Sequence, residues 1–289
     1  MSAQEIQQLA NPAVFADVLD YLNRREFPRI GVSASTPDTL YAVHDRICAH
    51  YASLQLDSLF QPLFDFRRRR IIGHEALLAS SSGDAFTMVG NVLSPERVFT
   101  LAANEDITFV DRLARTLHAL NYLLQSAEGV LHLNVHPHHL LSVSADHGRV
   151  FEGILKNCGL ETRRIVLEIP EYAVAEKKKV SAAIAAWKEK GYGIAIDNFG
   201  REHAQIGRVK KLQPDYIKLD RELLLRAQRD VRIQRNLAKS VQEAQQAGIA
   251  VIGAGIETGQ QLDLLRTLDV GIAQGFLFGR PQPYCLSAG

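Results

Sequence analysis

Short apolar segments alternate with amphipathic segments from residue 130 to near the end of the chain, and this alternation most constrains the fold. Each apolar segment is rich in Val, Ile and Leu, and most are followed by apolar residues at helical spacing. Two earlier apolar segments flank Arg67–Arg70 and predict a hairpin. The predicted strands are Leu59–Phe66, Ile71–Leu78, Val130–Val135, Ile165–Ile169, Tyr192–Ile196, Tyr216–Leu219, Ala250–Ile256 and Ile272–Phe278. Repeated strand and helix units favour a parallel sheet covered by helices.

Eight strands in about 230 residues favour a closed α/β barrel of the TIM type, (β/α)8, over an open doubly wound sheet. No GxGxxG or GxxxxGK[ST] motif follows the first strands, which argues against a nucleotide-binding open sheet. Residues 1–55 have a different pattern. Pro12–Arg25 has the apolar spacing of a helix, and a second helix is expected to begin at Thr36 and run through Tyr51. We therefore expect a helical extension at residues 1–55 and a barrel domain at residues 56–285.

Composition excludes several classes of partner. The net charge is +1, and Arg67–Arg70 lacks interleaved aromatic residues, so it predicts a solvated turn and no nucleic-acid partner. Three dispersed cysteines indicate reduced thiols, not a disulfide framework. The N-terminus lacks the pattern of a signal peptide, and no apolar run reaches the ~18 residues of a membrane span. We expect a soluble cytoplasmic protein that makes no membrane contact.

Polar side chains stand at the carboxyl ends of the predicted strands, where a parallel barrel gathers its active-site residues. They are Glu75, Asn134, Glu168, Glu171, Asp197, Asn198, Lys218, Glu257 and Gln274. Buried acids are costly unless they are paired or bound to a cation. The oxygen donors suit Mg²⁺ or Mn²⁺, not zinc. Two structural alternatives stay open: Lys218 as an ion-pair partner of a carboxylate, and Gln274 as a hydrogen-bonded core amide.

Four histidines surround Asn134, and this clustering invites a metal interpretation. They are His132, His136, His138 and His139. No cysteine accompanies them, so the sequence favours a surface loop with hydrogen-bonded imidazoles over a zinc site.

A set of ordered motifs resembles a known family. The motifs are Phe60–Leu63 (FQPL), Glu75–Leu77 (EAL), Asn134, Leu167–Glu171 (LEIPE), Asp197–Gly200 (DNFG), Ile217–Asp220 (IKLD), Gly255–Thr258 (GIET) and Gln274–Pro281 (QGFLFGRP). From about Ser58 to Pro283 the chain resembles an EAL domain, the cyclic-di-GMP phosphodiesterase family. The resemblance implies a modified TIM barrel with an antiparallel first strand.

The resemblance also implies a chemistry. Two divalent cations, Mg²⁺ or Mn²⁺, would activate a water that attacks one phosphodiester of cyclic-di-GMP, giving linear pGpG. Lys218 and Glu257 would be catalytic, and Glu171 would hold the loop after the fifth strand. The first cation would be bound by Glu75, Asn134, Glu168 and Asp197, and the ligand-binding residues would include Glu75, Gln274 and Asp197.

Three residues depart from the family pattern. Asn198 replaces the second aspartate of DDFG, Ala254 replaces an acidic residue, and Ala79 replaces an arginine that grips the ligand phosphate. The losses fall on the second-metal side, so one ion or none is expected, and the leading hypothesis is a non-catalytic regulator. It would bind cyclic-di-GMP or a protein partner, and a homodimer through the region after Gly200 is one expected assembly. The alternative is an active or weakly active phosphodiesterase, in which Asn198 and Glu202 or Glu257 complete the second metal site.

Overall fold

The computed structural model describes residues 15–28, 39–82, 95–102, 106–142, 149–175, 177–201 and 205–287. The strands are β1 (Leu40–Val43), β2 (Arg46–Tyr51), β3 (Leu54–Asp65), β4 (Arg70–Ser82), β5 (Val130–Asn134), β6 (Ile165–Pro170), β7 (Gly193–Phe199), β8 (Tyr216–Leu219), β9 (Ala250–Gly253) and β10 (Ile272–Ala273). The α-helices are α2 (Ala16–Arg25), α3 (Pro95–Leu101), α4 (Ile107–Leu124), α5 (Pro137–Ser142), α6 (Arg149–Asn157), α7 (Lys177–Glu189), α8 (Ile206–Val209), α9 (Arg221–Arg229), α10 (Val231–Gln246) and α11 (Gly259–Thr267).

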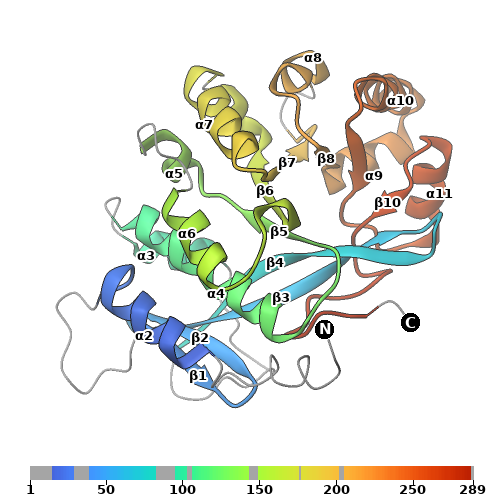
Figure 1. Cartoon of the computed structure of the whole chain (residues 1–289). Helices are drawn as coiled ribbons and strands as arrows, with labels where there is room; N and C mark the ends of the chain where they lie inside the picture. Colours follow the sequence, from blue (N-terminus) through green and yellow to red (C-terminus); the bar gives the residue numbers. More distant parts are fainter. Residues whose placement is uncertain are drawn as a thin grey trace.

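The strands β3 to β10 close into a barrel, as the sequence predicted. Their order in the sheet is β3-β10-β9-β8-β7-β6-β5-β4, and a pairing of β3 with β4 closes the ring. Strand β3 runs antiparallel to both of its neighbours in the ring, whereas the remaining pairs are parallel. Figure 1 shows the long β3–β4 pair crossing the molecule, with helices around the other strands. The carboxyl ends of the parallel strands therefore meet at one mouth of the barrel.

Apolar side chains on both faces of the strands hold this arrangement together. One hydrophobic cluster joins the barrel strands to the surrounding helices and includes the fully buried Trp187 of α7. Side-chain caps fix where the helices near the mouth begin. Asp220 accepts hydrogen bonds from the first turn of α9, and Thr258 forms a capping box with Gln261 at the start of α11. Asp220 directly follows β8, and Thr258 lies after β9. The two caps therefore fix where the chain turns from strand to helix next to Lys218 and Glu257.

The N-terminal part contains a helix and a β-hairpin. Helix α2 confirms the first predicted helix, but the second, expected from Thr36 to Tyr51, is wrong within the described residues: β1 and β2 occupy Leu40–Tyr51. Thr36, its predicted N-cap, lies outside the described residues. The missed signal is the two-residue turn at His44 and Asp45, where His44 has a positive φ of 53°. The division at residue 55 remains a prediction.

The hairpin extends the barrel sheet and is covered by its own hydrophobic cluster. Strand β2 pairs with β3, and apolar residues of α2, β1, β2 and α4 pack together there. The side-chain amide of Asn121 in α4 accepts from Ile47 N (2.9 Å) and donates to Ile47 O (2.7 Å). Helix α4 therefore contacts both the N-terminal hairpin and the barrel.

Three further predictions concern the surface and the thiols. Arg67–Arg69 lie in an exposed turn and the exposed Arg70 begins β4, close to the predicted turn, and the three cysteines are unpaired, as predicted. Among the described helices, none combines the length and the apolar character needed to cross a membrane. Helices α5 and α9 were not predicted, since each is short and follows a strand directly.

Candidate functional site

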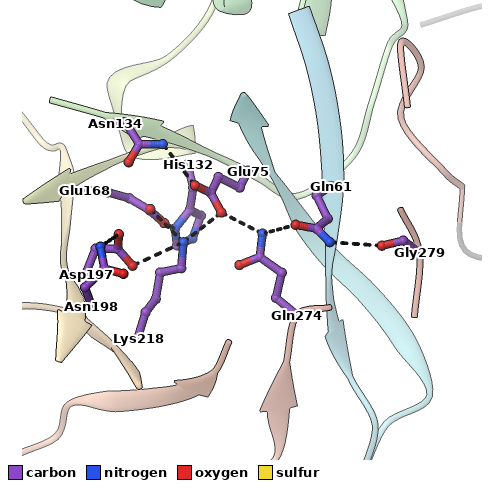
Figure 2. Close-up of polar contacts among 10 residues, drawn as sticks. All are labelled: Gln61, Glu75, His132, Asn134, Glu168, Asp197, Asn198, Lys218, Gln274 and Gly279. Carbon is purple, nitrogen blue, oxygen red and sulfur yellow. Dashed lines mark hydrogen bonds and ion pairs between the residues drawn. The ribbon is translucent and has the colours of Figure 1, made fainter. Parts of the chain in front are cut away.

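Five strands deliver polar side chains to the mouth of the barrel, where Figure 2 shows them pointing toward one another. The residues are Glu75 from β4, Asn134 from β5, Glu168 from β6, Asp197 from β7 and Lys218 from β8. We call these five residues the polar cluster. The parallel register explains why they meet, because Asn134 pairs with Glu168 in neighbouring strands.

Lys218 lies at the centre of the polar cluster. Its Nζ is 2.8 Å from Glu75 Oε2, 2.7 Å from Glu168 Oε2 and 3.6 Å from Asp197 Oδ1. The lysine is only 2% exposed, and although burial alone would lower its pKa, the three carboxylates raise it well above the ordinary value. Lys218 is therefore charged, and the structural alternative of an ion-pair partner is borne out by the geometry.

Amide side chains also donate to both carboxylate oxygens of Glu75. Asn134 Nδ2 donates to Oε1 (2.9 Å), and Gln274 Nε2 donates to Oε2 (2.6 Å). The Gln274 amide also contacts Gln61 Oε1 (3.2 Å), and Gln61 donates to Gly279 O (3.1 Å), as Figure 2 shows. Burial raises the pKa of Glu75, but Lys218 and these donors outweigh burial and lower it. Glu75 is thus a carboxylate held in one orientation.

His132 belongs to this site, and the prediction that places it in a surface loop is wrong. The side chain is fully buried on β5, and Nδ1 lies 2.7 Å from Glu168 Oε1. Burial and the charge of Lys218 lower the pKa of His132 to about 3, so the imidazole is neutral and shares a hydrogen bond with the Glu168 carboxyl group. His139 is also buried, against Asp111. The position of His132, two residues before Asn134 on one strand, was the available signal.

The charges of the polar cluster do not balance. Burial raises the pKa of Glu168 to about 8, with a contribution from Glu75, and raises that of Asp197 to about 7 against the attraction of Lys218. In the described residues no three His, Cys, Asp or Glu side chains are arranged as metal ligands, and Lys218 pairs with two of the acids of the polar cluster. The donor chemistry nevertheless fits a divalent cation, since carboxylate and amide oxygens with excess negative charge are what Mg²⁺ and Mn²⁺ bind.

Asn198 contributes no charge to the mouth. Its Nδ2 donates to Asp197 Oδ2 (2.6 Å), and its backbone adopts the left-handed conformation, with φ of 57°. Ala254, which follows β9, offers only a methyl group. Glu257 is exposed and forms an ion pair with Arg221 (2.9 Å). Glu202, the other acid considered for a second metal site, lies outside the described residues.

Two further residues of the sequence prediction, Ala79 and Glu171, lie in β4 and in the segment after β6. Ala79 is fully buried in β4, opposite Asp57 of β3. Glu171 follows β6, and its Oε2 accepts from the backbone N–H of Gly200 (2.8 Å). Gly200 has φ of 91°, where a side chain would be strained, and a Cβ would collide with Leu223. The contact ties the turn after β7 to the segment after β6.

A cavity of about 610 Å³ opens beside the polar cluster. Glu75, Asn134, Asp197 and Asn198 line one side of it. The other side is formed by α3, α4 and the segments that follow β5 and β6. Its volume is in the range of small-molecule sites, about 300–1,000 Å³.

Known proteins resemble this chain in sequence and in structure. A family model described as the EAL domain matches residues 49–281. The probable cyclic di-GMP phosphodiesterase PdeI of Escherichia coli K12 is 29% identical over 244 residues, covering 80% of this chain and 29% of the relative. For the probable phosphodiesterase PdeB of the same organism the identity is 25%, covering 84% of this chain and 44% of the relative.

A comparison with solved structures also finds a similar protein. The manganese and cyclic-di-GMP complex of Klebsiella pneumoniae BlrP1 at pH 9.0 superposes with a TM-score of 0.69 at 25% identity, covering 78% of this chain and 56% of that one. The chain spans less than half the length of the two curated relatives. The family match extends over most of the chain, from β2 to the segment after β10. The chain belongs to the EAL domain family.

Proposed function

We propose that this chain is a degenerate EAL domain of cyclic-di-GMP signalling, which binds cyclic-di-GMP without hydrolysing it efficiently. The relatives named as phosphodiesterases and the BlrP1 complex support the ligand. The observation that carries the loss of hydrolysis is the amide of Asn198, which hydrogen-bonds Asp197 where the family has a second carboxylate. Ala254 adds no ligand, and Glu257 is paired with Arg221.

The surviving half of the site suits one Mg²⁺ or Mn²⁺ ion, held by Glu75, Asn134, Glu168 and Asp197. Such an ion, when bound, supplies positive charge for the ligand phosphate. Lys218 would favour the ionised form of these carboxyl groups and hold them close together. A second ion, which in two-metal enzymes helps clamp the attacking and leaving oxygens, would find few charged ligands at Asn198.

An active or weakly active metal-dependent phosphodiesterase, giving linear pGpG, is the second candidate. The observation that favours it is the complete polar cluster, including the buried Lys218 with its two short ion pairs. In that case Glu257 would have to leave Arg221 to act as a base or as a ligand of the second metal.

Calorimetric titration of cyclic-di-GMP, with and without Mn²⁺, followed by a turnover assay separates these functions. Binding of cyclic-di-GMP without its hydrolysis supports the proposal. Hydrolysis at a rate usual for the family would contradict it. The double variant Asn198→Asp, Ala254→Glu is expected to raise turnover by tenfold or more, on the order of one recovered charge interaction. No gain would mean that the second-metal ligands are not what limits activity.

The other form of the regulator hypothesis is a domain that binds a protein partner instead of cyclic-di-GMP. It would be favoured if neither cyclic-di-GMP binding nor turnover were detected. A homodimer through the region after Gly200 and a cytoplasmic location remain predictions. Size-exclusion chromatography with light scattering tests the first, and cell fractionation tests the second.

A further inference from the structure

Helix α10 presents a basic face to solvent on the outside of the barrel. Its buried side chains belong to the hydrophobic cluster of the barrel and are Leu237, Val241 and Ala244. With about 100° of rotation per residue, Arg232, Arg235 and Lys239 fall on the opposite face of the helix, and all three are exposed. We call these three residues the α10 stripe. It extends about 10 Å along the helix axis.

The α10 stripe has no acidic partner among the described residues. None of its three side chains forms an ion pair with another described residue. Glu243, one turn beyond Lys239, is already paired with Lys210, which directly follows α8 (2.9 Å). Asp230 caps the start of the helix by accepting from the backbone N–H of Arg232. The positive charge of the stripe is therefore not compensated by these neighbouring acids.

Two other exposed helices pair their basic residues with acids on their own surface. Arg24 pairs with Asp20 in α2 (2.8 Å), and Arg266 pairs with Asp263 in α11 (2.7 Å). Opposite charges three or four residues apart stabilise a helix, whereas like charges at that spacing destabilise it. The α10 stripe places like charges three and four residues apart, so it does not serve the stability of its own helix.

The excess of positive charge extends to the elements beside the stripe. From residue 205 to residue 247, Lys and Arg outnumber Asp and Glu by ten to five, whereas the whole chain has 33 against 32. Helices α8 and α9 contact α10, and Figure 1 shows the three on the same side of the molecule. They and the turn after α8 carry the exposed basic residues Arg208, Lys211 and Arg229. This side of the barrel therefore attracts an anionic partner.

The surroundings of the stripe disfavour a lipid surface, a single-stranded nucleic acid and a second copy of the chain. A helix that lies in a membrane inserts its apolar face, but the apolar face of α10 is packed in the core. Single-stranded nucleic acids stack on aromatic rings, and the one exposed large hydrophobic side chain in the described parts of α8, α9 and α10 is Val231. A second copy would place the same positive charges against each other across a two-fold axis.

We propose that the α10 stripe docks an acidic helix of a protein partner, whose carboxylates pair with Arg232, Arg235 and Lys239. Two of the three residues are arginines, and a planar guanidinium binds a carboxylate through two parallel hydrogen bonds. Carboxylates at positions i, i+3 and i+7 of a helix span the same distance of about 10 Å. The inference goes beyond the proposed function and does not depend on it, because the stripe lies outside the polar cluster and the cavity beside it.

The test is fluorescence anisotropy of the whole chain with a labelled alanine-based helical peptide that carries glutamates at i, i+3 and i+7. The double variant Arg235→Gln, Lys239→Gln is expected to weaken peptide binding about tenfold at low salt. The matched control is Arg24→Gln, Arg25→Gln, which removes the same charge from exposed residues of α2, on the opposite side of the molecule in Figure 1. It is expected to weaken binding less than about twofold.

A second peptide tests the alignment of the charges. It has the same composition, but its glutamates are spread around the helix, and it is expected to bind the wild type more weakly. Arg232→Gln, at the other end of the stripe, is expected to act in the same direction as the double variant and serves if that variant is unstable. Cyclic-di-GMP titration of the same variants should match the wild type, which separates this inference from the proposed function.

Several outcomes would overturn the inference. Equal weakening in the α10 and α2 variants would mean that net charge alone decides binding, and equal affinity for the two peptides would mean that no aligned helix is recognised. Tighter, stripe-dependent binding of a DNA duplex or of phosphatidylserine vesicles would assign the surface to another class of partner. A wild-type dimer that the α10 variant loses in light scattering would assign it to a second copy of the chain.

Discussion

Replacing Lys218 by Met tests whether this lysine neutralises the buried acids of the mouth. The substitution keeps the length of the side chain and removes the only positive charge within ion-pair distance of Glu75 and Glu168 among the described residues. Breaking a buried ion pair by removing one partner costs about 3–5 kcal/mol, because the other charge stays buried. We expect a loss of that size in the free energy of unfolding at pH 7.5 without divalent cation.

The assay is urea unfolding followed by circular dichroism. Lys190→Met is the matched control, since Lys190 pairs with Glu152 at 2.9 Å but the two side chains are 22% and 40% exposed. That exposed pair should contribute at most about 1 kcal/mol. Adding Mn²⁺ should restore part of the stability of Lys218→Met, because a cation can replace the missing charge.

Lowering the pH should also reduce the cost of Lys218→Met. Without the lysine the acids stay protonated to higher pH, so at pH 5.5 the native variant contains neutral carboxyls and loses little by lacking the charge. The reasoning would be refuted by equal losses in the two lysine variants, or by a Lys218→Met loss that is the same at pH 5.5 and pH 7.5.

Three further predictions concern the cation, the loop and the N-terminal hairpin. The native pKa values of Glu168 (about 8) and Asp197 (about 7) exceed their unfolded values, so between pH 6.5 and 8 metal-free stability should fall as pH rises. Mg²⁺, which displaces these protons, should raise the thermal midpoint more at pH 8 than at pH 6.5, and an equal rise contradicts this. Glu171→Ala removes the acceptor of Gly200 N–H and should weaken Mn²⁺ binding measured by calorimetry while changing the thermal midpoint little. Asn121→Leu strips both hydrogen bonds from a buried backbone unit of β2 and should cost about 2–4 kcal/mol in urea unfolding, whereas a loss below 1 kcal/mol would show that water replaces the amide.

The barrel was predictable because its strands are buried on both faces and therefore continuously apolar. Strand β8 was predicted to the residue. The antiparallel direction of the first barrel strand was predicted from the family resemblance, since apolar content alone does not distinguish parallel from antiparallel pairing. The β1–β2 hairpin was missed because its alternation also fits a helix and its turn, at His44, is not a glycine.

The sequence predicted which residues form the polar cluster, but not which hydrogen bonds and ion pairs they make with one another. Strand ends in a barrel must converge, so Glu75 and Glu168 were placed together from their positions alone. The sequence could not show that Lys218 lies between them, since rotamers and burial decide that contact. The alternation of the strand places His132 on the same face as Asn134, but it could not show that the imidazole contacts Glu168.

The backbone at Asn198 makes the proposed restoration of the second carboxylate interpretable. A φ of 57° strains most side chains, but Asn and Asp both tolerate it because their short polar groups bond locally. Asn198→Asp should therefore keep the turn and change mainly the charge beside Asp197. It also removes the 2.6 Å hydrogen bond from Nδ2, so the two acids would repel unless a cation or proton lies between them. A variant stabilised by Mn²⁺ more than the wild type would thus report a gained ligand, independently of turnover.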